Sequence, residues 1–108
     1  MGCIKVSIIR IFDDKDYPGW AECILKDIFG TTHRFIDKVP IFSKLYLDSK
    51  SRVPLDGFIR CEIIRKWAEN GKSLIEVSTN APDHVETSEG ITTFILLEEQ
   101  VLQAQKGE

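Results

Sequence analysis

The sequence predicts an all-β fold, a small antiparallel β-barrel or half-barrel of about six strands. Runs of Ile, Val and aromatic residues recur along the chain, and clusters of Gly, Pro, Asn and Asp separate them. The length of 108 residues is sufficient for one hydrophobic core. A two-sheet β-sandwich is the alternative, and we prefer the barrel because closure leaves fewer strand edges exposed. No repeat, low-complexity tract or linker divides the chain, so we treat 1–108 as a single β domain.

Residues 3–12 predict the first strand, because Ile and Val dominate this segment and polar residues interrupt it. Residues 13–19 form an acidic loop that ends in the turn dipeptide Pro18-Gly19. Residues 20–28 and 32–39 predict the second and third strands, which a tight turn at Gly30 would join.

The register of this second pair of strands is open at the sequence level. A two-residue turn at Phe29 and Gly30 would place Glu22 opposite Asp37, and like charges in that position destabilise a strand pair. A register shifted by one residue places Glu22 opposite Lys38 instead. We therefore expect the shifted register.

Residues 58–68 predict the clearest strand, because Asn70-Gly71 follows it and this dipeptide is the strongest short-range hairpin signal. A two-residue turn there brings two opposite-charge pairs and one apolar pair into register: Glu69 with Lys72, Arg65 with Glu76, and Trp67 with Leu74. The agreement of these pairs predicts a hairpin over residues 58–79. We expect Trp67 to pack as a core or half-core residue.

The remaining segments are less regular. Pro40 ends the third strand or places it at an edge, and residues 41–56 predict a long excursion with a short helical or extended piece. Residues 80–90 predict a loop, and residues 91–97 predict the last strand. The tail, residues 98–108, is expected to be a short helix or a frayed end.

Composition excludes several classes of protein. Fourteen Lys and Arg face seventeen Asp and Glu, a net charge of −3, which argues against a dedicated nucleic-acid binder. An apolar content of 43% argues against disorder, and no stretch is long enough to span a membrane. Three cysteines without a CxxC pair fit neither a disulfide framework nor a zinc site. We expect Cys23 and Cys61 to be small buried hydrophobes, in a protein of the reducing cytoplasm.

No phosphate-binding, metalloprotease or nucleophile-elbow motif occurs in the sequence. His33 alternates onto the face of Phe35 and Asp37, and we interpret it as a strand histidine bonded to a neighbouring carboxylate. A small enzyme using His33 and Asp37 is the least favoured function. We therefore predict no enzyme activity, no catalytic residue, no metal site and no cofactor.

Two segments are candidates for binding a partner. The acidic loop joins negative charge to aromatic side chains, which suits a basic protein surface. The long excursion supplies further aromatic side chains, and these are favoured at interface centres. The candidate partner-binding residues are Asp13, Asp14, Asp16, Tyr17, Trp20, Phe42, Tyr46 and Asp48.

Five strings carry a resemblance to a known group of proteins. They are Trp20-Ala21-Glu22-Cys23, the H-x-F-x-D-K-V-P pattern of residues 33–40, the G-F-I-R-C-E-I-I-R-K-W run of residues 57–67, the N-G-K of residues 70–72, and the E-G-x-T-x-F of residues 89–94. Together they resemble a group of small uncharacterised bacterial β-domain proteins. These are similar to immunity proteins of polymorphic and contact-dependent growth inhibition toxins. The resemblance brings no catalytic motif and no binding residue with it.

The resemblance implies a cytoplasmic immunity protein that binds a cognate secreted toxin domain and blocks its active site. The toxin would be a nuclease, and its basic phosphate-binding surface would favour an acidic inhibitor. We expect a monomer in a 1:1 complex, with no nucleic-acid or membrane partner. The alternative is a small β-barrel interaction module that binds RNA or a small ligand, with Arg60, Arg65 and Lys66 as its basic residues. Pairing of Arg65 with Glu76 would use one of these charges locally.

Overall fold

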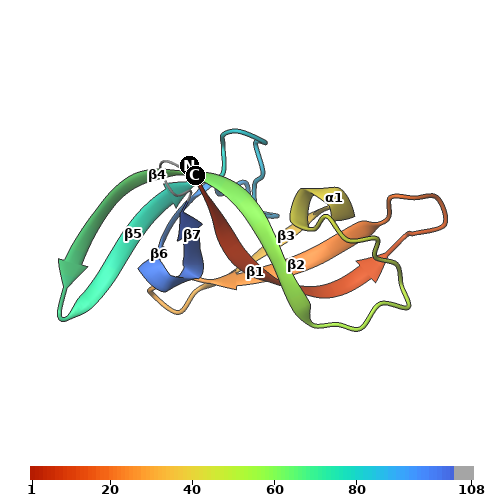
Figure 1. Ribbon diagram of the computed structural model, residues 1–108, viewed down its shortest axis with the longest axis horizontal. Coiled ribbons are helices and arrows are strands. Elements are labelled where there is room, and N and C mark those ends of the chain that lie inside the picture. The colour runs from red at the N-terminus through yellow and green to blue at the C-terminus, as the bar shows by residue number, and fades with distance from the viewer. Residues whose placement is uncertain (104–108) are drawn as a thin grey trace.

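The computed structural model, which describes residues 1–103, shows a curled antiparallel half-barrel (Figure 1). Six strands follow one another in the sheet in the order β3-β2-β1-β4-β5-β6, and β7 pairs with β1 beside that path. The strands are β1 Gly2–Phe12, β2 Trp20–Lys26, β3 Thr32–Lys38, β4 Leu55–Glu69, β5 Lys72–Ser78, β6 Thr93–Leu97 and β7 Val101–Gln103. The all-β class and the half-barrel are confirmed, and the two-sheet sandwich is not formed.

Two long strands hold the half-barrel together. β1 pairs with β4 through Gly2–Ile8 and with β2 through Ser7–Phe12, so it belongs to both parts of the sheet. β4 pairs with β1 along its first half and with β5 along its second half. An irregularity lies between Ile8 and Arg10 in β1, and another lies between Ile63 and Arg65 in β4. Because such bulges bend a strand and increase its twist, they curl the sheet.

After β6 the expected short helix is present, but it spans only three residues and the chain then forms a strand instead of fraying. The 3-10 turn η1, Glu98–Gln100, leads directly into β7, which pairs with Gly2–Ile4 of β1. Val101 is buried opposite Ile4, so this short strand contributes to the core. Residues 104–108 of the predicted tail lie outside the described residues.

The β2–β3 hairpin has neither of the registers considered from the sequence. Glu22 lies opposite Ile36, and Ala21 lies opposite Asp37. Asp27 N donates a hydrogen bond of 3.0 Å to Thr31 O, so the pairing continues past the strands and leaves a turn of three residues rather than two. The Asp27 side chain organises this turn. Asp27 Oδ1 accepts hydrogen bonds from the backbone N–H groups of Phe29 at 2.9 Å and Thr31 at 3.0 Å. Gly30 then takes a φ of +83°, which glycine tolerates best.

The β4–β5 hairpin confirms its predicted register. The structure pairs Glu69 with Lys72, Trp67 with Leu74, and Arg65 with Glu76. Asn70 and Gly71 have φ values of +51° and +77°, as a type I′ turn requires. Trp67 is half-buried, as expected, and the Arg65 guanidinium lies 4.2 Å from the centre of its ring. This hairpin projects from one end of the molecule (Figure 1).

The chain after β3 forms a single helical turn, α1 Val39–Phe42, with Pro40 in the first turn. Pro40 has no N–H to lose there, so it suits the start of a helix. Val39 N donates a hydrogen bond of 3.0 Å to Gly19 O, which fixes α1 beside the β1–β2 loop. Residues 43–54 follow as the irregular excursion before β4.

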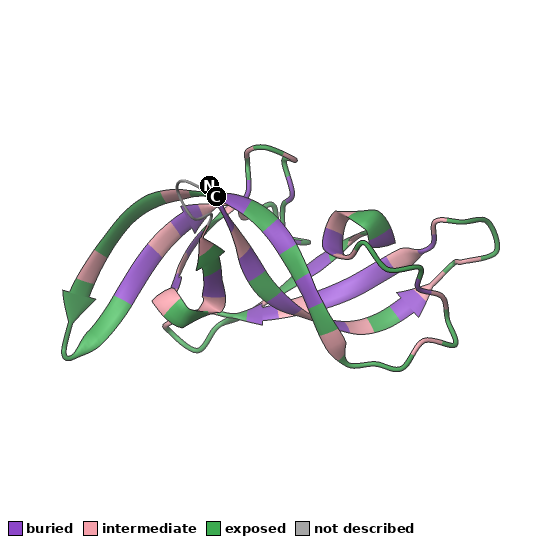
Figure 2. Cartoon of the chain, viewed as in Figure 1, coloured by how far each residue is buried: buried purple, intermediate pink, exposed green. Residues whose placement is uncertain are grey.

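One continuous core fills the inside of the curled sheet (Figure 2). Residues buried in the core alternate with more exposed ones along most of β1 and the first half of β4, whereas in β2 Ala21, Glu22 and Cys23 are buried in succession. Cys23 and Cys61 are fully buried, as expected. The largest buried side chains are Phe35, Phe42, Ile4, Ile8, Ile59, Ile75 and Leu96.

Candidate functional site

The two candidate segments meet at one end of the molecule, opposite the β4–β5 hairpin (Figure 1). Tyr17 of the β1–β2 loop stacks on Tyr46 of the excursion, with ring centroids 5.1 Å apart and an angle of 17° between the rings. Tyr17 is 58% exposed and Tyr46 is 70% exposed. We define the tyrosine end as residues 13–18 together with residues 43–52.

Hydrogen bonds hold the two segments of the tyrosine end together. Ser49 N donates a hydrogen bond of 2.6 Å to Asp14 Oδ2, across 35 positions of the sequence. The hydrogen bonds from Ser49 lower the pKa of the Asp14 carboxyl below its usual range. Asp48 shapes the second segment from within, because its Oδ1 accepts from Lys50 N at 2.9 Å. Asp48 N in turn donates to Ser51 Oγ at 3.0 Å.

The structure distributes the other predicted site residues differently. Asp13 and Asp16 are exposed on the same loop as Tyr17. Trp20 lies half-buried at the start of β2, with Lys38 Nζ 5.0 Å from the centre of its ring. Phe42 is 1% exposed, and its place in the candidate site was wrong. Its side chain faces the core from α1 because an amphipathic turn buries its apolar residues.

The charge of the tyrosine end differs from the acidic surface expected from residues 13–16. The carboxylates of the tyrosine end belong to Asp13, Asp14, Asp16 and Asp48. An equal number of cations comes from Lys15, Lys44, Lys50 and Arg52. Because the excursion brings its lysines beside the acidic loop, the two signs balance. The exposed aromatic pair, rather than net charge, distinguishes this surface.

His33 forms the carboxylate contact that was expected of it, with Asp27 as the partner. His33 Nε2 lies 2.7 Å from Asp27 Oδ2, and both side chains are about nine-tenths buried. Burial acts to raise the pKa of Asp27, but hydrogen bonds from His33 and from two backbone N–H groups outweigh it and lower the pKa. The His33 ring also packs edge-on against Phe94 at 4.9 Å. This pair joins the β2–β3 turn to β6.

The two core cysteines have weakly acidic thiols. Burial raises the pKa of Cys23 to about 12 and the pKa of Cys61 to about 11. Thiolates are the reactive form of cysteine, so these two side chains are poor nucleophiles at neutral pH. Cys3 is only partly buried.

A second surface was missed in the sequence. Directly opposed residues of an antiparallel pair share one face of the sheet, so the register shows which side chains lie together. The outer face is defined here as the side of β1, β2, β3 and residues 55–61 of β4 that points away from the core. Its cations are Lys5, Arg10, Lys26, Arg34, Lys38 and Arg60, and its acids are Glu22 and Asp56. Each of the four strands carries at least one Lys or Arg on this face, and that is the signal that could have found it.

The basic residues considered earlier for RNA are engaged within the fold. Arg60 donates to both carboxylate oxygens of Asp83, at 2.9 and 2.5 Å, and this contact lowers the pKa of Asp83. Arg65 Nε donates to Glu76 Oε1 at 2.6 Å. Lys66 Nζ donates to Gln103 Oε1.

No family model, curated protein or solved structure matches the chain. Within residues 1–103, no group of three or more His, Cys, Asp or Glu side chains could hold a metal ion. The same residues include no helix with the length and apolar character needed to cross a bilayer.

Proposed function

We propose that this protein acts by binding another protein, and that the tyrosine end is its docking surface. The proposal rests on the stacked pair of Tyr17 and Tyr46. Each of these side chains is more than half exposed, and a hydrogen bond between Ser49 and Asp14 holds their two loops together. Tyrosine is enriched among the residues that dominate binding energy. A fixed aromatic pair also loses little side-chain freedom when a partner covers it.

Neighbouring side chains support the same use of this surface. Leu45 is 62% exposed beside Tyr46 and adds apolar area to the patch. Four carboxylates and four cations lie in the same two segments and supply a polar rim of both signs. Apolar anchors surrounded by polar residues are the usual anatomy of a specific interface. Recognition would then depend on shape and hydrogen bonding, with charge fixing the orientation.

The partner we propose is a cognate toxin domain, which the protein would neutralise in the cytoplasm as a monomer in a 1:1 complex. This choice is supported by the resemblance of the five sequence strings to small bacterial β-domain proteins, which are similar in size and context to immunity proteins. A nuclease toxin is the favoured class. Against its basic active site, the exposed carboxylates of Asp13 and Asp16 would fix the orientation of the complex, and Tyr17 and Tyr46 would supply the main contact.

The test is co-expression with the toxin domain encoded next to this protein's gene, followed by measurement of growth and of complex affinity. We expect the native chain to restore growth and the Tyr17→Ala/Tyr46→Ala variant to fail. That variant should bind the toxin at least about 30-fold more weakly, the loss typical of a hot spot. Phe29→Ala is the matched control, because Phe29 is 75% exposed on the β2–β3 turn, away from the tyrosine end.

Two results would overturn the proposal. One is toxicity that the native chain fails to relieve although both proteins are soluble. The other is an affinity that Phe29→Ala and the double tyrosine variant lower equally, since the docking surface would then lie elsewhere. Circular dichroism and thermal unfolding of each variant separate lost contacts from lost folding.

A further inference from the structure

The outer face has a charge opposite to that of the whole chain. It carries six Lys and Arg against Glu22 and Asp56, whereas the chain as a whole has a net charge of −3. Asp83 and Glu99 approach the face from neighbouring segments and reduce the excess of cations without removing it. Such segregation creates a local positive potential that attracts anions.

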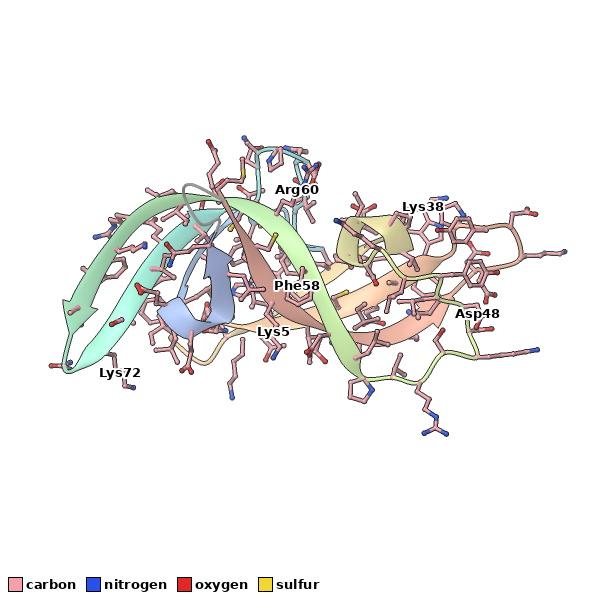
Figure 3. All side chains as sticks on the ribbon, viewed as in Figure 1. Lys5, Lys38, Asp48, Phe58, Arg60 and Lys72 are labelled. Atoms are coloured by element: carbon pink, nitrogen blue, oxygen red, sulfur yellow. The ribbon has the colours of Figure 1, made fainter. Side chains whose placement is uncertain are left out.

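Aromatic and aliphatic side chains alternate with these cations. Phe58 lies directly opposite Lys5, and both labels stand together where β1 and β4 run side by side (Figure 3). Ile24 lies opposite Arg34 on the neighbouring pair of strands. Phe12 and Trp20 lie opposite each other farther along the face. The mixture of apolar side chains and cations therefore extends across all four strands.

The carboxylates on the face leave much of the positive charge available. Glu22 receives hydrogen bonds from both Arg10 and Arg34, so one negative charge is shared between two guanidinium groups. These arginine side chains remain 56% and 49% exposed. Lys5 Nζ lies 3.6 Å from Asp56, but both side chains are more than half exposed, and such pairs are weak. Within residues 1–103, Lys26 forms no ion pair.

A hollow lies on the face where β2 diverges from β1. Its lining includes Lys5, Ser7, Ile24, Lys26 and Asp56, and η1 closes one side with Glu99 and Gln100. Gln100 Nε2 donates to Lys26 O at 3.0 Å and so fixes this border. The hollow combines two cations, Lys5 and Lys26, with two carboxylates, Asp56 and Glu99, an apolar floor and polar hydrogen-bonding groups.

We propose that the outer face binds single-stranded nucleic acid. Phosphates would contact Lys5, Lys26 and Arg34, and an unpaired base would stack on Phe58, which is 36% exposed beside Lys5. Proteins that bind single strands combine a positive track with aromatic side chains in this way. A duplex keeps its bases stacked inside, so it would leave the aromatic groups unused. This site is separate from the tyrosine end and does not depend on the function proposed above.

The experiment is fluorescence anisotropy of labelled oligo-dT and oligo-U of about 15 nucleotides, from about 50 to about 200 mM salt. We expect binding that weakens steeply with salt, with the DNA and RNA probes compared side by side. The Lys5→Glu/Lys26→Glu variant should bind at least about tenfold more weakly than the native chain. Phe58→Ala should weaken binding at least about fivefold while changing the salt dependence little.

The matched control is Lys44→Glu/Lys50→Glu, which makes the same change of net charge at the tyrosine end. It should weaken binding by less than about threefold, because its lysines lie off the outer face. Each variant's fold is checked by thermal unfolding before titration.

Four results would overturn the proposal. They are no binding at about 100 µM protein in low salt, an equal loss in the control variant, equal affinity for duplex DNA, and equal affinity for inorganic polyphosphate. The last result would show attraction to any polyanion, an acidic protein surface included. The tyrosine variants should leave oligonucleotide binding unchanged, so failure here is distinct from failure of the protein-binding proposal.

Discussion

The side chain of Asp27 determines the register of the β2–β3 hairpin, which the charges of the opposed strand residues could not predict. Both registers considered from the sequence were judged by the charge opposite Glu22. In the structure, Glu22 accepts hydrogen bonds from Arg10 and Arg34 on the two neighbouring strands, so its charge does not depend on the residue opposite it in β3. Hydrogen bonds to Asp27 set the geometry of the turn. One carboxyl group accepts from Phe29 N, Thr31 N and His33. Hydrogen bonds between an Asp side chain and backbone N–H groups two and four residues ahead can be recognised only when the conformation of the turn is already known.

The lowered pKa of Asp27 predicts a pH-dependent contribution to stability. Its folded-state pKa is below the ordinary value of 3.8, so the charged form stabilises the fold at higher pH. That contribution is lost as pH falls below the ordinary value and through the folded value. Asp27→Asn keeps an oxygen for the two backbone N–H groups and removes the titration. We expect urea unfolding to show a smaller loss of stability between about pH 6 and about pH 2 in this variant. An equal loss in both proteins would contradict the role given to Asp27.

Thiol reactivity gives a second prediction at the residue scale. Cys23 and Cys61 are fully buried with raised pKa values of about 12 and about 11, whereas Cys3 is partly exposed. Under native conditions near neutral pH, a disulfide reagent should modify Cys3 alone, and all three cysteines should react after unfolding. Cys3→Ser should abolish the fast phase. A fast phase that persists in Cys3→Ser would mean that a core thiol is accessible.

Strands and turns that depend on residues close together in the sequence could be predicted, whereas those that depend on contacts between distant segments could not. The β4–β5 hairpin follows from Asn70-Gly71 and three pairs of residues close to it. β7 has only three residues, and it forms because β1 offers an edge about a hundred positions earlier. Phe42 illustrates the same limit, since its aromatic ring indicated an interface until α1 placed it in the core.

The close packing of Gly57 in β4 against β1 and α1 gives a prediction about how these elements fit together. A Cβ at Gly57 would lie 2.9 Å from two side-chain carbons of Ile8 and 3.3 Å from Phe42 O. Gly57→Ala should therefore lower the free energy of unfolding by about 1–3 kcal/mol, as overpacking does. The neighbouring exposed Asp56→Ala should change it by less than about 0.5 kcal/mol. Chemical denaturation measures both, and equal stabilities would mean that the backbone at Gly57 has room to shift.

Over the whole molecule, the distribution of charge matters more than its total. A net charge of −3 argued against a nucleic-acid partner, and the acidic loop argued for a basic protein partner. Folding changes both inferences. The acidic loop is balanced by lysines of the excursion, while six cations from four strands gather on the outer face. Neither grouping is visible in a linear sequence, because it depends on which strands are neighbours and on which face each residue points.

The pairing of β1 with β7 also determines when this fold can be completed. Gly2 pairs with Gln103 on one side and with Cys61 on the other, so the earliest strand has no full set of neighbours until the latest strand exists. A chain emerging from the ribosome would leave the hydrogen-bonding edge of β1 at Gly2–Ile4 unpaired until β7 has been synthesised. Long-range pairings of this kind slow folding, because the entropy of loop closure is lost before the contacts form. β7 must therefore be present before the Gly2–Ile4 edge of the sheet can be paired, whatever the local turns have already formed.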